Sequence, residues 1–237
     1  MDSKFMGLVQ RLQVPDRPKK CGSYSGPRVA VIYGFMARRL MQRNLLHYLR
    51  SRGLSDVTLY GHMHSVDSIS DDLQASRSEG RSIVILGYSQ GGFQAVKVAR
   101  QLERRGVDVA LLVSIAAGGL GRVFPGRWGF EPRNVPTNVD VCLNFFSQGD
   151  LLGCDRNHQM NEAVGSRASQ RIENHMFHAH EGVSHLDLVR CYPEDGINPA
   201  VRTQVIERIM AEISGLKRSD AQESAQADRP VFGRPSA

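Results

Sequence analysis

Ser89 lies in a pattern of residues that is typical of a covalent catalyst. The segment Gly87-Tyr88-Ser89-Gln90-Gly91 matches Gly-x-Ser-x-Gly, follows an apolar run and precedes a stretch with helical periodicity. In such a setting the glycines allow a sharp turn from a strand into a helix, which presents the central hydroxyl for attack on a carbonyl carbon. The pattern therefore predicts that Ser89 is a nucleophile.

Two other interpretations of this turn are a glycine-rich connection in an ordinary α/β protein and a phosphate-binding turn. The phosphate-binding patterns GxxxxGK[ST] and GxGxxG do not occur here, and no lysine follows where a phosphate-binding loop would place one. The nucleophile is therefore the favoured interpretation, and the glycine-rich connection is the alternative to it.

A serine hydroxyl attacks weakly at neutral pH, so it needs a base and a carboxylate that orients the base. Behind a turn of this kind the expected chain order is serine, acid, histidine. Asp150 is the first candidate for the acid, because it follows the apolar run 139–146 at the carboxyl end of an expected strand. Asp155 in the same loop is the second candidate. The alternative role for either aspartate is to cap a helix.

His185 is the predicted base, because it stands in EGVSHLDLVR between the last weak strand candidate and a short apolar stretch. His175, His178 and His180 compete with it. Their spacing, without a matching cysteine or acidic pattern, is weak evidence for a metal site, so no metal is expected. Asp187 is expected to begin a helix rather than to serve as the acid.

The negative charge that develops on a carbonyl oxygen during attack needs prearranged backbone NH donors. Gln90, directly after the nucleophile, is expected to supply one donor. Phe35, in the turn YGFMA after the first strand, is expected to supply the second, and Gly34 permits that turn. The side chains predicted to line a substrate pocket are Met36, Tyr88, Phe124 and Trp128. The alternative is that these side chains only pack within loops or against the core.

Alternating strands and helices must bring these distant side chains together. Apolar runs predict strands at 28–33, 56–61, 83–86, 107–119 and 139–146, with a weaker candidate at 171–179. Helical periodicity lies at 38–53, 66–79, 93–102 and 199–216. The expected fold is α/β, a doubly wound, mostly parallel sheet with helices on both faces, whose active sites lie at the carboxyl ends of the strands.

The length of 237 residues suits one domain, expected at 28–216. An irregular arm at 1–27 should precede it, and a disordered tail at 217–237 should follow. Residues 118–136 are rich in glycine, proline and arginine, which favours a loop or small lid, so the predicted fold has a small cap or none.

The formal net charge of +6 comes from interspersed charges of both signs, without a basic block of the kind that binds nucleic acid. Arg122, Arg127 and Arg133 could steer an anionic substrate, with solvated surface charge as the alternative. No run is long enough to span a membrane and no secretory signal is evident, so a soluble, cytoplasmic protein is expected. The four widely spaced cysteines favour reduced thiols. The oligomeric state is not predicted.

The segments IYGFMA, GYSQGG, the GD of FFSQGD and GVSHLDL resemble the α/β-hydrolase superfamily, in its esterase, lipase and thioesterase branch. The resemblance covers about 28–216, and GYSQGG is its specific part. It implies a triad of Ser89, Asp150 and His185, hydrolysis through an acyl-enzyme, and no cofactor. GYSQG is also similar to the nucleophile motif of cutinases, although the spacing from Asp150 to His185 is long for them. Tyr33 stands where many members of the superfamily carry histidine.

The sequence thus predicts a serine hydrolase that cleaves a carboxylic ester or thioester in a small-molecule or lipid-like acyl substrate. Two alternatives stay open. One is a noncatalytic binding protein on the same scaffold, and the other is an acyltransferase that uses the same triad in a drier pocket. The identity of the substrate and the length of its acyl chain do not follow from the sequence.

Overall fold

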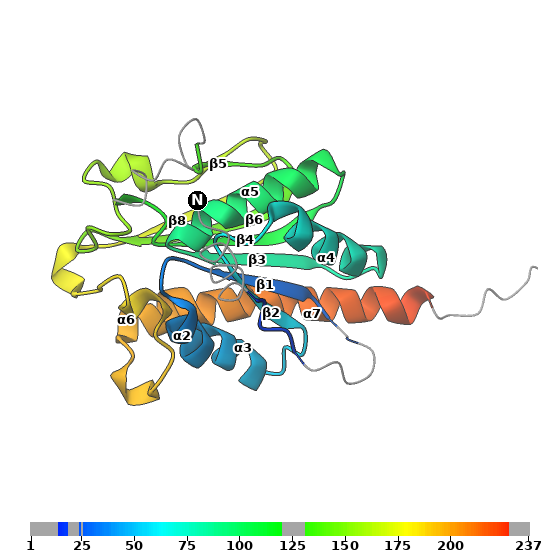
Figure 1. Cartoon of the computed structure of the whole chain (residues 1–237), viewed down its shortest axis with the longest axis horizontal. Helices are drawn as coiled ribbons and strands as arrows, with labels where there is room; N and C mark the ends of the chain where they lie inside the picture. The colour runs from blue at the N-terminus through cyan, green and yellow to red at the C-terminus, as the bar shows by residue number, and fades with distance from the viewer. Residues whose placement is uncertain (1–13, 19–23, 25, 120–130, 228–237) are drawn as a thin grey trace, which may run out of the picture.

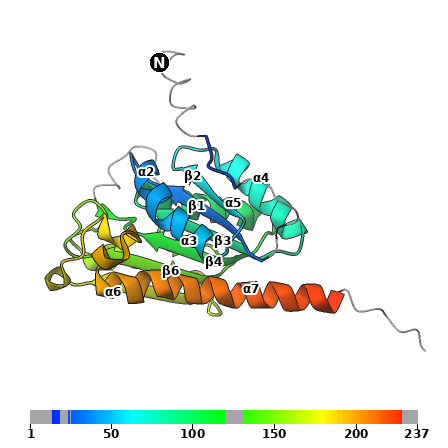
Figure 2. The ribbon, with the colours of Figure 1, turned by 90° about the horizontal axis from the view of Figure 1, so that it is seen from below.

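The computed structural model describes residues 14–18, 24, 26–119 and 131–227, which form a parallel sheet of six strands between helices (Figure 1, Figure 2). The strands are β1 (Arg28–Tyr33), β2 (Val57–Gly61), β3 (Ile83–Tyr88), β4 (Val109–Ile115), β6 (Val139–Ser147) and β8 (Arg171–Phe177). Their order is β2-β1-β3-β4-β6-β8, and all five pairings among them are parallel. The predicted sheet is therefore confirmed.

The order of the strands reverses beside β1. The chain passes from β1 outward to the edge strand β2, and then returns to β3 on the other side of β1. Loops that leave β1 and β3 diverge at such a reversal and open a crevice at the carboxyl ends of the strands. The residues expected to do chemistry follow these two strands directly, because the first turn begins at Gly34 and the second contains Ser89.

Helices cover both faces of the sheet (Figure 1). One face carries α4 (Val66–Ser78) and α5 (Gln90–Arg104). The other face carries the continuous helical segment α2 (Arg38–Met41), η1 (Gln42–Leu46) and α3 (His47–Ser51), together with α6 (Pro199–Val201), η8 (Arg202–Glu207) and α7 (Arg208–Ala227). The predicted helices at 38–53, 66–79, 93–102 and 199–216 are thus confirmed, with boundaries that differ by a few residues.

Two apolar cores follow from this arrangement, one on each face. Along β1, Val29 and Val31 face the core beneath α3 and α7, whereas Ala30 and Ile32 face the core beneath α4 and α5. Both sets of side chains are fully buried. In a strand covered by helices on both faces, side chains on either face are removed from water, so apolar residues are favoured at successive positions. This explains why the strands are nearly continuous apolar runs.

The remaining described elements are short. The strands β5 (Asn134–Val135) and β7 (Val164–Gly165) pair in parallel apart from the main sheet. Short 3-10 turns lie at η4 (His158–Asn161), η5 (Ala179–Glu181), η6 (Asp187–Val189) and η7 (Glu194–Gly196). Part of the predicted loop at 118–136 therefore forms a strand. Residues 120–130, which include Arg122, Phe124, Arg127 and Trp128, lie outside the described residues.

Helix α7 continues to Ala227, so the predicted onset of a disordered tail at residue 217 is wrong for residues 217–227. The reason is a contact that the polar composition of this segment does not reveal. The buried carboxylate of Asp220 accepts hydrogen bonds from the backbone NH of Ser82, at 3.2 Å, and from its hydroxyl, at 2.6 Å. This contact ties the helix to the start of β3. No described helix, α7 included, has the length and apolar character needed to cross a membrane.

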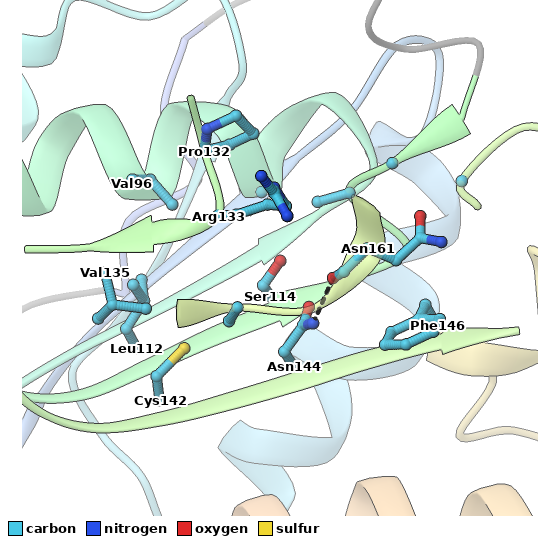
Figure 3. Close-up of a pocket in the computed structure, with 15 residues that line it drawn as sticks. Val96, Leu112, Ser114, Pro132, Arg133, Val135, Cys142, Asn144, Phe146 and Asn161 are labelled. Atoms are coloured by element: carbon cyan, nitrogen blue, oxygen red, sulfur yellow. Dashed lines mark hydrogen bonds between the residues drawn. The ribbon is translucent and has the colours of Figure 1, made fainter. Parts of the chain in front are cut away.

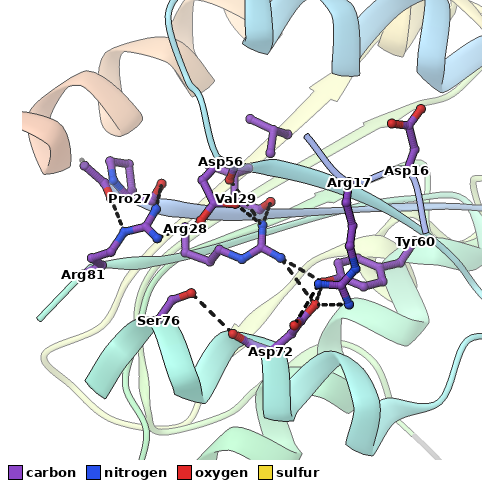
Figure 4. Close-up of polar contacts among 12 residues, drawn as sticks. Asp16, Arg17, Pro27, Arg28, Val29, Asp56, Tyr60, Asp72, Ser76 and Arg81 are labelled. Atoms are coloured by element: carbon purple, nitrogen blue, oxygen red, sulfur yellow. Dashed lines mark hydrogen bonds and ion pairs between the residues drawn. The ribbon is translucent and has the colours of Figure 1, made fainter. Parts of the chain in front are cut away.

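A buried cluster of charges joins the amino ends of three neighbouring strands (Figure 4). The Asp56 carboxylate lies 3.0 Å from Arg28 and 2.7 Å from Arg81, and all three side chains are more than nine-tenths buried. Removal of one partner would leave a buried charge unpaired and would lower the free energy of unfolding by about 3–5 kcal/mol. From the N-terminal segment, Arg17 adds an ion pair to Asp72 of α4, at 2.7 Å. The cluster thus fastens the sheet at the end opposite the crevice.

The N-terminal segment 14–18 also reaches the edge of the sheet. Asp16 and Leu59 of β2 exchange two backbone hydrogen bonds, of 2.9 and 3.0 Å, in an isolated antiparallel bridge. The predicted irregular arm at 1–27 is therefore in contact with the sheet at this point.

Candidate active site

Ser89 occupies a strained turn between β3 and α5. Its φ of 54° and ψ of −122° lie in a region that residues with a side chain rarely adopt. The backbone NH of Ser89 donates to the carbonyl of Ile115 at the end of β4, at 2.8 Å, which helps to hold this conformation. The predicted sharp strand-to-helix turn at Ser89 is therefore present.

The glycines around Ser89 are required by close backbone approaches. A Cβ atom on Gly91 would lie 2.0 Å from the carbonyl oxygen of Ile32 in β1, and one on Gly87 would lie 2.5 Å from the Gly91 carbonyl oxygen. Neither contact is possible between real atoms, and the obstructing atoms belong to backbone that cannot move aside. The Gly-x-Ser-x-Gly pattern is thus explained by the packing of α5 against β1 and β3.

Asp150 and His185 form a hydrogen bond of 2.6 Å between the carboxylate Oδ2 and the ring Nδ1. The Asp150 side chain is 1% exposed. Its second oxygen, Oδ1, accepts from the backbone NH groups of Leu152, at 3.0 Å, and Gly153, at 2.9 Å. These three contacts satisfy the buried carboxylate and hold Nδ1 of the imidazole, which leaves Nε2 as the nitrogen available for a substrate or nucleophile.

Of the two candidate acids, Asp150 is the one that contacts His185. Asp155 lies instead in a turn around Asn161, whose side-chain oxygen accepts from the Asp155 NH at 2.7 Å. Asp187 is the first residue of η6, as predicted for a helix start, and its carboxylate accepts from the NH and hydroxyl of Ser184.

The other candidate histidines lie in different surroundings. His175 is a residue of β8, and its ring lies 4.8 Å from that of Phe177 and 6.1 Å from that of Phe145. His178 and His180 stack on each other with 5.6 Å between their ring centres. Within the described part of the chain, no group of three or more histidine, cysteine, aspartate or glutamate side chains has the geometry to hold a metal ion.

Ser89 and His185 line one pocket of about 480 Å³ at the carboxyl ends of β1 and β3. No hydrogen bond joins their side chains in the described structure. Hydrogen bonds between catalytic groups are often long or poorly aligned until substrate binds. The other residues that line the pocket are Phe35, Met36, Ala37, Leu40, Tyr88, Gln90, Leu152 and Leu186.

The rim of this pocket carries large apolar side chains that are open to solvent. Met36 is 86% exposed, Phe35 66%, Leu152 58% and Leu186 49%. Exposed apolar groups gathered at one place are typical of a binding surface. Leu152 and Leu186 had not been predicted from the sequence. Leu152 lies in the loop of Asp150, Leu186 follows His185 in the chain, and only the fold brings the two leucines to the pocket of Met36.

The turn after β1 lies against the start of α5. A Cβ atom on Gly34 would lie 2.8 Å from the Ser89 Cβ and 2.9 Å from the backbone nitrogen of Gln90. Phe35, the next residue, therefore enters the pocket beside the amino end of a helix, where backbone NH groups favour negative charge. This arrangement suits the predicted pair of NH donors, Phe35 and Gln90, whose role stays a prediction.

Tyr88 was predicted to contact substrate. It lines the pocket, yet it is only 1% exposed, and its hydroxyl donates to the backbone carbonyl of His185 at 3.1 Å. Met36 lines the pocket, and its contact with substrate stays a prediction. Phe124 and Trp128 belong to the segment outside the described residues, so their proposed contact with substrate stays a prediction.

A second cavity, between α5 and the strands β4 and β6, measures only about 30 Å³ (Figure 3). Ser114, Arg133, Asn144 and Asn161 contribute polar groups to its wall, and Asn144 donates to the backbone carbonyl of Asn161 at 2.7 Å. The volume suits one water molecule and no substrate. The pocket of Ser89 and His185 is the candidate active site because it joins the serine of the strained turn to the histidine that is bonded to Asp150.

The cysteines of the described region do not compete with Ser89 as nucleophiles. Cys142, Cys154 and Cys191 are buried and form no disulfide, which agrees with the expected reduced thiols at these three positions. Burial raises the pKa of Cys142 and Cys191 to about 12 and that of Cys154 to about 11. Because the thiolate is the reactive form, such thiols are inert at neutral pH.

No protein-family model matches the sequence, and no curated protein matches it. Several solved structures do resemble it. An esterase of the archaeon Pyrobaculum calidifontis gives a TM-score of 0.51 at 16% identity, over 81% of this chain and 78% of that one. A thermostable carboxyl esterase from Bacillus coagulans gives 0.50 at 11% identity, over 86% and 93%.

The RedJ thioesterase of the prodiginine pathway in Streptomyces coelicolor gives a TM-score of 0.48 at 12% identity, over 90% of this chain and 96% of that one. At identities this low, the similarity concerns the arrangement of the backbone and does not show that the chemistry is shared. The two esterases, at TM-scores of 0.51 and 0.50, and the parallel sheet of six strands show that this chain has the α/β-hydrolase fold.

Proposed function

We propose that the protein hydrolyses carboxylic esters or thioesters through an acyl-enzyme formed on Ser89. The observation that carries this proposal is that His185, which is hydrogen-bonded to the buried Asp150, lines the same pocket as a serine on a strained turn. A carboxylate, an imidazole and a serine in that relation are the parts that activate a hydroxyl for attack. The esterases named among the structural neighbours agree with this chemistry.

In the acylation step, the Ser89 oxygen attacks the carbonyl carbon while Nε2 of His185 takes the hydroxyl proton. Asp150 stabilises the imidazolium that forms and keeps the ring in the required tautomer. The backbone NH groups of Phe35 and Gln90 donate to the oxygen that becomes negative. His185 then gives its proton to the departing alcohol or thiol, and the bond from the carbonyl carbon to the leaving group breaks.

In the deacylation step, a water molecule replaces the alcohol or thiol. His185 takes one proton from this water as its oxygen attacks the acyl carbon, and the same NH groups again receive the negative charge. Return of the proton to the Ser89 oxygen releases the acid and restores the enzyme. The cycle needs no cofactor, because every proton that leaves a group returns through His185.

The proposed substrate is a small-molecule or lipid-like ester with an apolar acyl chain. The apolar rim formed by Phe35, Met36, Leu152 and Leu186 supports this choice, because an acyl chain laid across it would cover side chains that otherwise face water.

A fluorophosphonate probe tests the proposal, because it reacts with serines that are activated by a base. We expect labelling of the wild type and none of Ser89→Ala. Ser70→Ala is the matched control, because Ser70 is a buried serine of α4 outside the pocket, and it should label like the wild type. A folded wild type that does not label would overturn the proposal in favour of a noncatalytic binding protein.

Product analysis separates hydrolysis from acyl transfer. The wild type is given p-nitrophenyl esters of graded chain length, with and without an alcohol, and the acid and the new ester are measured. Acid as the main product in both cases supports hydrolysis. A new ester that dominates when alcohol is dilute would show an acyltransferase.

A further inference from the structure

His185 stands in a segment that has no regular secondary structure, between η5 and η6. Its backbone is therefore not held by a sheet or by a helix. Two side chains from the ends of strands hold the segment instead. The hydroxyl of Ser147, the last residue of β6, donates to the carbonyl of Val183 at 2.6 Å, and the hydroxyl of Tyr88, the last residue of β3, donates to the carbonyl of His185 at 3.1 Å.

Tyr88 makes a second contact with the same residue. Its ring lies 4.9 Å from the His185 imidazole, centre to centre, at an angle of 37° between the ring planes. Ring centres at this distance are within the range in which aromatic rings attract each other. The phenol thus fixes the backbone of His185 while its ring supports the imidazole, so both the position and the tilt of the base depend on Tyr88.

Tyr88 is also the residue directly before Ser89, joined to it through one planar peptide bond. The end of β3 therefore carries the nucleophile on one residue and the anchor of the base on the next. Burial, and then the negative charges of Asp150 and Asp187, raise the pKa of Tyr88, so its hydroxyl keeps its proton and stays a donor.

We infer that Tyr88 is a positioning residue that sets the place of the His185 imidazole relative to the Ser89 hydroxyl. This inference rests on the proposed function, in which His185 is the base. It also replaces the expectation that Tyr88 binds substrate, because a side chain that is 1% exposed and whose hydroxyl is engaged with His185 has little left to offer an acyl chain.

Two variants of Tyr88 separate its two contacts. Tyr88→Phe removes the hydroxyl and keeps the ring, and Tyr88→Leu removes both. We expect kcat for a p-nitrophenyl ester to fall about fivefold in the first, the effect of one lost hydrogen bond. In Tyr88→Leu we expect kcat to fall about a hundredfold, which is the effect of a misplaced catalytic group. KM should stay at the wild-type value in both, because binding of the substrate is not altered.

Tyr60→Phe is the matched control. Tyr60 is also buried on a strand of the sheet, and its hydroxyl is bonded to Arg28 and Asp72 at a distance from the pocket. The same chemical change there should leave kcat unaltered. Urea unfolding of all variants shows how much fold stability each one loses.

A readout that does not need turnover is the proton between Nδ1 of His185 and Asp150, observed by NMR and assigned by its loss in Asp150→Asn. A held imidazole protects this proton from exchange with water. We expect its signal to be sharp in the wild type and Tyr60→Phe, and broadened in Tyr88→Phe.

The outcomes separate the inference from the function on which it rests. A wild type that neither turns over esters nor reacts with fluorophosphonate would refute the proposed function. If the wild type is active, equal kcat and equal proton signals in Tyr88→Phe and the wild type would refute the positioning role alone. A raised KM at unchanged kcat would also refute it, because Tyr88 would then be a substrate contact.

Discussion

The carboxylate of Asp150 and the imidazole of His185 meet at 2.6 Å, although 35 positions separate them in the chain. The carboxylate is completed by two backbone NH groups of its own loop and is almost fully buried. A buried charge with this many partners is tied to one geometry, because no partner can be lost without leaving it unsatisfied. The relation therefore fixes the position of His185, the base of the proposed mechanism.

Asp150→Asn tests this relation directly. The amide can still bond to the ring, but it presents a donor where a carboxylate accepts, so the imidazole takes the wrong tautomer. We expect kcat to fall by about 10³–10⁴-fold with little change in KM. Asp155→Asn, in the same loop but away from His185, is the control and should retain activity. Equal losses in the two variants would argue against Asp150 as the acid.

The apolar rim predicts a preference for long acyl chains. Leu152→Ser and Leu186→Ser each remove apolar surface from the mouth of the pocket, so KM for a p-nitrophenyl octanoate should rise about tenfold, with little effect on the acetate. Val164, an exposed valine of the small sheet, offers the control Val164→Ser. Variants that alter both esters equally would show that the rim does not contact the acyl chain.

Two glycine-to-alanine changes should have opposite effects on the free energy of unfolding, because Gly91 at the serine turn is closely packed and Gly215 in α7 is not. A Cβ on Gly91 would lie 2.0 Å from the Ile32 carbonyl oxygen, so Gly91→Ala should lose about 3 kcal/mol or more of unfolding free energy, or fail to fold. Gly215 in α7 has open space around its Cβ position. Gly215→Ala should gain about 0.5–1 kcal/mol, because alanine favours the helix. Urea unfolding of both variants measures the two values.

The buried cysteines predict that the protein loses stability at alkaline pH. Burial raises the pKa of Cys142 and Cys191 from 9.0 to about 12. Below pH 9 these thiols are protonated in both the folded and the unfolded chain, so their full contribution to stability is present there. Between pH 9 and 12 the unfolded chain alone releases the protons, and stability falls as pH rises.

Each of these cysteines should contribute a slope of about 1.4 kcal/mol per pH unit within that window. Urea unfolding of the wild type at pH 8, 9, 10 and 11 measures the total slope. Cys191→Ala removes one of these groups, so its slope above pH 9 should be smaller by about that amount. An unchanged slope in Cys191→Ala would contradict the prediction.

Features that depend on neighbouring residues could be predicted from the sequence. The turn at Ser89 follows from the steric needs of Gly87 and Gly91, and the strands follow from apolar runs that suit burial on both faces. Because parallel strands place their carboxyl ends at one edge of the sheet, these local features already indicated where the candidate residues would gather.

Features that depend on contacts between distant residues were decided by the tertiary structure alone. The chain order admits Asp150 as the first candidate acid and Asp155 as the second, and only the fold shows that Asp150 is the one in contact with His185. The contact of α7 with the start of β3 joins Asp220 to Ser82, which lie 138 positions apart. The contact of Tyr88 with His185 likewise has no local signal, because the energy of such contacts comes from burial and hydrogen bonds that exist only after the chain has folded.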